Sequence, residues 1–75
     1  MHGNAWVDAA IGAILRMAAE RSGRLVAVCV ALPDHLHASE AQALAQALHR
    51  AGHHGVAVEV VAGQHPRLVS AEFER

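Results

Sequence analysis

The stretch RLVAVCVAL, residues 24–32, decides the fold, since it is a continuous apolar run of strand length. Its larger side chains alternate with small ones, and this period of two is typical of a β-strand. One face of the strand is expected to carry Val26, Val28, Val30 and Leu32, and the other face Ala27, Cys29 and Ala31. Pro33 cannot continue a ladder of hydrogen bonds and is expected to end the strand.

Helical periodicity is present on both sides of this strand. Residues 5–22 are predicted to form an amphipathic helix whose apolar stripe is Val7, Ile11, Ile14 and Ala18, flanked by Leu15. Residues 39–51 are predicted to form a second helix, with Ser39 and Gln42 as a capping box and Gly52 at its end. The second helix is expected to bury Ala41, Leu44, Ala45 and Leu48.

Two further strands complete the chain. Residues 55–62 are expected to turn Val56, Val58 and Val60 inward, and residues 67–74 to turn Val69, Ala71 and Phe73 inward. A right-handed crossover makes the first two strands parallel, and the short turn GQHP, residues 63–66, makes the third antiparallel to the second. The predicted fold class is α/β, in the order α-β-α-β-β. Two helices pack on one face of a three-stranded mixed sheet, within a single domain of residues 1–75.

Composition excludes several classes of protein. Six basic and seven acidic residues form no basic stripe, so neither nucleic acid nor an anionic membrane is an expected partner. A single cysteine, Cys29, excludes an intramolecular disulfide and a Cys-based zinc site, and it is expected to be an inert packed thiol. Asp8 and Arg16 interrupt the first apolar stretch, so we expect no signal peptide, no membrane span and a cytoplasmic location.

Seven histidines are the main anomaly of the composition. The first of them, His2, directly follows the initiator methionine. A bulky residue at position 2 usually blocks removal of that methionine, so Met1 is expected to stay with a free amine. The amine of Met1, the amide nitrogen and imidazole of His2, and the amide nitrogen of Gly3 can then surround Ni(II) or Cu(II) in a plane. The alternative is a terminal histidine without a ligand role.

Chain direction sorts the histidines into two groups. The chain start, the segment PDHLH after the first strand and the turn GQHP are expected at one end of the sheet, which gathers His2, His35, His37 and His65. His49, His53 and His54 are expected at the opposite end. In an extended segment the rings of His35 and His37 would point the same way; the alternative is two solvated loop residues. A hydrolytic triad of Ser39 with these histidines is not expected, because capping explains Ser39 and no strained nucleophile turn is present.

Four stretches together resemble the HypA/HybF family, whose members help to insert nickel into nickel–iron hydrogenase. They are MHGNAWVDAAIGAILRMAAERSGRLVAVCVAL, SEAQALAQALHRAG, VAVEVVA and RLVSAEFER. The family carries a zinc-binding domain with two cysteine pairs between its last two strands, and here GQHP stands in its place. The family's acidic third residue is Gly3 in this chain.

The resemblance implies a non-enzymatic, metallochaperone-like nickel-binding accessory protein whose partner is a hydrogenase or another maturation factor. Met1 and His2 match the nickel motif, Gly3 can add its backbone nitrogen, and His35, His37 and His65 would be accessory donors. The alternative function is a metal-independent interaction or scaffold module, which could also form homo-oligomers. It would use an exposed edge of the first or third strand, or the outward face of the sheet, which is expected to carry Ala27, Cys29, Ala31, Glu59, Ser70 and Glu72.

Overall fold

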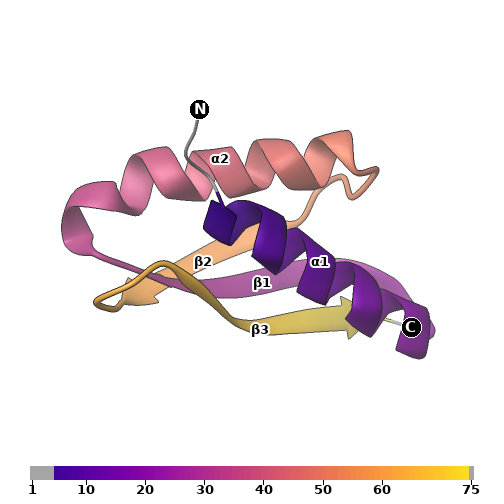
Figure 1. The fold of residues 1–75 in the computed structure, drawn as a ribbon. Coiled ribbons are helices and arrows are strands. Elements are labelled where there is room, and N and C mark those ends of the chain that lie inside the picture. The colour runs from indigo at the N-terminus through magenta and orange to yellow at the C-terminus, as the bar shows by residue number, and fades with distance from the viewer. Residues whose placement is uncertain (1–4, 75) are drawn as a thin grey trace.

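The computed structural model describes residues 5–74, and it has the predicted order of elements, α-β-α-β-β (Figure 1). A short 3₁₀ turn, η1, precedes the second helix. The elements are α1 (Ala5–Glu20), β1 (Arg24–Leu32), η1 (Asp34–Leu36), α2 (His37–Arg50), β2 (Ala57–Ala62) and β3 (Arg67–Glu74). Both helices lie above the same face of the sheet, so the predicted fold class is confirmed.

The sheet has the order β2-β1-β3, with β1 in the centre. β1 and β2 are parallel, as the crossover through α2 predicts. β3 runs antiparallel to β2, as predicted, but it forms its ladder with β1 and not with β2. The nine residues of β1 are the most apolar strand, and the central position buries them between two neighbours. The edges are therefore β2 and β3, so of the two strands that were expected to offer an edge, the third does and the first does not.

Two irregularities in the β1–β3 pairing change which side chains face the helices. Leu25 pairs with Phe73 and Ala27 with Glu72, which leaves Val26 as an extra residue in β1. In the same way, Cys29 pairs with Ser70 and Val30 with Leu68, which leaves Val69 extra in β3. An extra residue in one strand shifts its alternation by one position.

As a result, Leu25 is buried at 3% exposure, and Leu68 packs against the core. Val26 is only half-buried and Val69 is 46% exposed. The prediction that Val26 and Val69 face the core is therefore wrong, because a strict period of two cannot anticipate a bulge.

The core lies between the two helices and the sheet. α1 buries Val7, Ala10 and Ile14, and α2 buries Leu44 and Leu48, in one cluster with Leu25, Val28, Val30 and Leu32 of β1. Ile11 is partly buried beside them, whereas Ala18 does not belong to the core cluster, Leu15 is 47% exposed and Ala45 faces solvent. Ala10, which is 3% exposed, and the partly buried Ala47 belong to the inward stripes of the two helices.

The second helix begins earlier than predicted. Asp34–Leu36 form η1 and lead directly into α2 at His37, so Ser39 lies inside the helix and does not cap it. Gly52 does end the helix, with a φ of 94° that a residue with a side chain rarely adopts. The amides of Gly52 and His53 donate to the carbonyls of His49 and Leu48, at 3.0 and 2.9 Å, in the pattern of a Schellman cap.

The face of the sheet opposite the helices is largely composed of small and acidic side chains. Ala57, Glu59, Ser70 and Glu72 are exposed and Cys29 is partly exposed. Ala31, which was expected among these outward residues, is 0% exposed because Gly63 lies against it. No helix in the described part of the chain is long and apolar enough to cross a lipid bilayer.

Candidate functional site

The carboxyl end of β1 holds His37 in a defined orientation. Pro33 ends the strand, η1 turns the chain, and His37 becomes the first residue of α2. Its Nε2 donates to the carbonyl oxygen of Leu32 at 3.1 Å, and the same nitrogen lies 3.5 Å from Oδ1 of Asp34. Because a carbonyl oxygen can only accept, Nε2 carries the proton in this bond and Nδ1 of the neutral ring presents its lone pair.

The turn between β2 and β3 reaches the same carbonyl. The amide of Gly63 donates to the oxygen of Leu32 at 3.1 Å, so this oxygen accepts from both Gly63 and His37. The turn that carries the exposed His65 therefore begins beside the first residue of α2. Chain direction predicted that these two segments share one end of the sheet, and the structure places them there.

The first turn of α1 lies at this end as well. Nε1 of Trp6 donates to Oε1 of Glu40 at 2.6 Å, which joins the start of α1 to the first turn of α2. Trp6 also lines a shallow hollow of about 180 Å³ between α1 and the start of β3. The other residues around the hollow are Ala9, Ala10, Ala13, Pro66, Arg67 and Leu68. Trp6 thus contacts α2 and borders the start of β3.

The interpretation in which the rings of His35 and His37 point the same way does not hold in the structure. The two residues lie in η1 and the first turn of α2, not in an extended segment. Residues two apart in a helical segment point in nearly opposite directions, so these rings do not face one another. His35 is exposed, whereas His37 is half-buried through its contact with Leu32. One of the two predicted loop histidines is therefore held in place, and the other faces solvent.

Met1, His2 and Gly3 lie outside the described residues, so their role as nickel ligands stays a prediction. Within residues 5–74, no group of three or more His, Cys, Asp or Glu side chains is close enough together to hold a metal ion. The structure brings His37 and Asp34 together and places the turn of His65 nearby, while Ser39 is exposed on α2.

The remaining histidines lie at the other end of α2, as predicted, but they pair in an unexpected way. Nδ1 of His49 and Nδ1 of His54 are 2.9 Å apart, and the two ring centroids are 4.3 Å apart. The signal that could have found the pair is the glycine helix stop between positions 49 and 54, because a chain reversal at Gly52 returns residue 54 to the last helical turn.

Comparisons with models of protein families, with curated proteins and with solved structures find no match to this chain. The fold and the site define a small α/β domain in which a histidine, an aspartate and the turn before β3 meet at the carboxyl end of the central strand.

Proposed function

We propose that this chain is a non-enzymatic nickel-binding accessory protein, similar in role to the HypA/HybF maturation factors that its sequence resembles. The observation that carries the proposal is the hydrogen bond from Nε2 of His37 to the carbonyl oxygen of Leu32. Histidines that bind metal ions usually donate their second ring nitrogen to a carbonyl or carboxylate, which fixes the tautomer and the ring orientation. His37 has both kinds of group at that nitrogen, Leu32 at 3.1 Å and Asp34 at 3.5 Å.

The donor set suits nickel. The amine of Met1, the amide nitrogen and imidazole of His2 and the amide nitrogen of Gly3 would fill the plane, and an imidazole at the carboxyl end of β1 would be an accessory donor beside it. Nitrogen donors in a plane favour Ni(II) or Cu(II) over metals that prefer oxygen ligands. In this proposal the ion is cargo for another enzyme, so the ligands hold it without further chemistry.

The position of α1 is compatible with a shared site. His2 precedes Ala5 by three residues, a separation of about 10 Å at full extension. The bond between Trp6 and Glu40 holds the start of α1 beside the turn of α2 that follows His37. Of the accessory donors, His37 is therefore the one that we propose to complete or receive the nickel site, with His65 as a second candidate and His35 pointing elsewhere.

The test is nickel binding by the untagged chain, followed by the absorption of square-planar Ni(II) and by calorimetry. Either His2→Ala or acetylation of Met1 is expected to abolish the square-planar band. Replacing His37 with alanine is expected to weaken nickel affinity by about tenfold or more, which is the usual loss when a side chain that supports a metal site is removed. Binding should also weaken as pH falls, because protons compete for the same nitrogens.

His35→Ala is the matched control, because it removes an exposed histidine from the same segment and should leave nickel affinity unchanged. Nickel affinity that is unaltered by both His2→Ala and acetylation of Met1 would overturn the proposal. Equal losses in His35→Ala and His37→Ala would show that the orientation of His37 has no special role.

A metal-independent scaffold module is the second candidate function, and the sheet face that no element of residues 5–74 covers favours it. Val61 on β2 is 42% exposed and Val69 on β3 is 46% exposed, among small side chains such as Ala57 and Ser70. Apolar side chains on an uncovered sheet are typical of a surface that a partner covers. On this proposal the partner is a metalloenzyme, one of its maturation factors or a second copy of the chain.

Self-assembly through this surface can be tested by sedimentation in the presence of EDTA. The double variant Val61→Arg and Val69→Arg is expected to abolish self-association, whereas Leu15→Arg on the exposed side of α1 should not. Leu15 is a fair control because it is 47% exposed, close to the exposure of both valines. A chain that stays monomeric in EDTA at all concentrations would exclude the homo-oligomer.

A further inference from the structure

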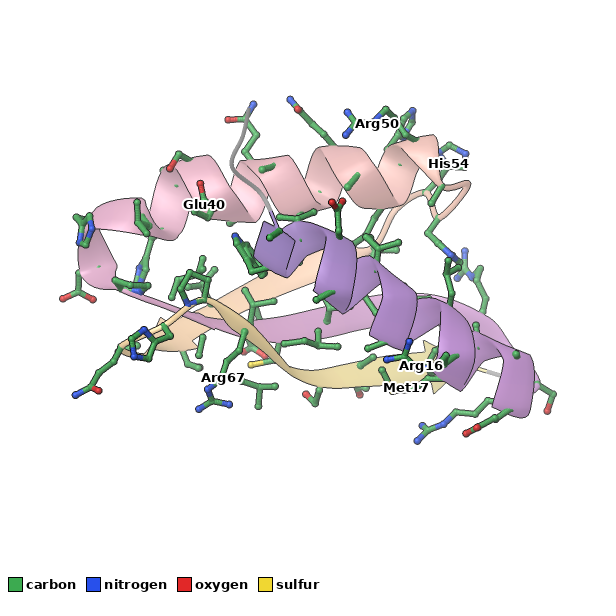
Figure 2. The ribbon with its side chains drawn as sticks, in the orientation of Figure 1. Arg16, Met17, Glu40, Arg50, His54 and Arg67 are labelled. Atoms are coloured by element: carbon green, nitrogen blue, oxygen red, sulfur yellow. The ribbon has the colours of Figure 1, made fainter. Side chains whose placement is uncertain are left out.

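The rings of His49 and His54 form a second cluster of donors, separate from the proposed nickel site. Both side chains are exposed, and their Nδ1 atoms are 2.9 Å apart with the ring planes at 79°. Figure 2 shows His54 and Glu40 at opposite ends of α2. His49 follows His37 by twelve residues, which is about 18 Å along a helix. The two clusters therefore cannot share an ion.

The backbone fixes the approach of the two rings. Two hydrogen bonds of the helix cap, from Gly52 to His49 and from His53 to Leu48, reverse the chain at the end of α2. Gly52 permits this reversal with its φ of 94°. His54 is thus returned to the last helical turn by a defined turn and not by a flexible loop, so the pair is organised before any ligand arrives.

We propose that His49 and His54 form a bidentate site for a square-planar divalent cation, with Cu(II) as the preferred ion. Metal–nitrogen bonds of about 2.0–2.1 Å and the observed nitrogen separation of 2.9 Å give a nitrogen–metal–nitrogen angle of about 90°. That is the angle between neighbouring ligands in square-planar and tetragonal coordination. A tetrahedral zinc site would need the two nitrogens to be about 3.3 Å apart.

Protonation and charge are consistent with such a site. One Nδ1 must carry a proton to bridge the two rings, and the other must accept it. When both Nδ1 atoms bind the cation, that proton moves to Nε2 of the same ring, so two neutral rings release no net proton. The carbonyl groups at the carboxyl end of α2 carry partial negative charge, which favours a cation there.

The experiment is a Cu(II) titration of the untagged full-length chain, followed residue by residue through paramagnetic broadening of amide NMR signals. Copper at this site is expected to broaden the amide signals of residues 48–56 at lower Cu(II) concentrations than the other signals of α2. His49→Gln or His54→Gln should raise the Cu(II) concentration needed for this broadening by about tenfold or more. Each variant removes a direct ligand, and loss of a hydrogen-bond partner behind a ligand already costs about tenfold in metal affinity. His53→Gln is the matched control, because it removes the adjacent ring and leaves the pair intact.

This test is independent of the proposed nickel site, because only signals of residues close to the bound copper ion are broadened. His2→Ala should not change the broadening around residues 48–56, whatever it does to nickel binding. Zn(II) should bind the pair more weakly than Cu(II). Absence of broadening around residues 48–56, or an equal loss in His53→Gln and His54→Gln, would overturn the copper site.

Discussion

Replacement of Leu44 with alanine is expected to unfold much of the protein at room temperature. Leu44 is 0% exposed and lies in the core between α2 and β1. Truncating a buried leucine to alanine costs about 2–5 kcal/mol, because the surrounding side chains close the cavity only in part. A domain of this size has about 3–5 kcal/mol of stability in total. Urea unfolding followed by circular dichroism and Trp6 fluorescence measures the loss.

Leu15→Ala is the matched control for this prediction. It removes the same atoms from a helical leucine that is 47% exposed, so its free energy of unfolding should change by less than about 0.5 kcal/mol. A urea midpoint for Leu44→Ala close to that of the wild type would contradict the described core. So would an equal loss of stability in both variants, because the position of α2 on the sheet would then not matter.

Replacement of Gly63 with alanine is expected to destabilise the fold by about 1–3 kcal/mol, the usual cost of forcing atoms into a packed interior. A Cβ at Gly63 would lie 2.8 Å from Cβ of Ala31, which is itself fully buried in β1. Gly63 does not have a positive φ, so the substitution causes a clash without backbone strain. The clash matters because the amide of Gly63 bonds to Leu32 where the chain crosses the end of β1.

Two further variants isolate this contact in the same urea experiment. Gly12→Ala, inside α1, meets only the Arg16 side chain at 3.6 Å. It should stabilise the protein by about 0.5–1 kcal/mol through helix propensity. Adding Ala31→Gly to Gly63→Ala should relieve the clash, so the double variant is expected to be more stable than the sum of the two single effects. Strictly additive effects would show that the two residues are not in contact.

The candidate site was predictable in part, for reasons that differ between its residues. Chain direction alone places residues 33–37 and the turn 63–66 at one end of the sheet, because a strand–helix–strand crossover fixes which ends meet. It could not show that His37 and Gly63 share the carbonyl of Leu32, since that contact depends on η1 and on the path across β1. The pairing of His49 with His54 likewise depends on a chain reversal at Gly52.

The types and order of the elements are determined by the sequence itself, since apolar periodicity, Pro33 and Gly52 act over a few neighbouring residues. The tertiary structure alone decides that β3 pairs with β1, that Val26 and Val69 are extra residues, and that Leu25 and Leu68 reach the core. The short turn at residues 63–66 would allow β3 to pair with β2, whereas in the structure β3 pairs with β1. Pairing with β1 places the most apolar strand between two others, beneath the two helices. This burial involves every element of the fold, so local sequence patterns do not predict it.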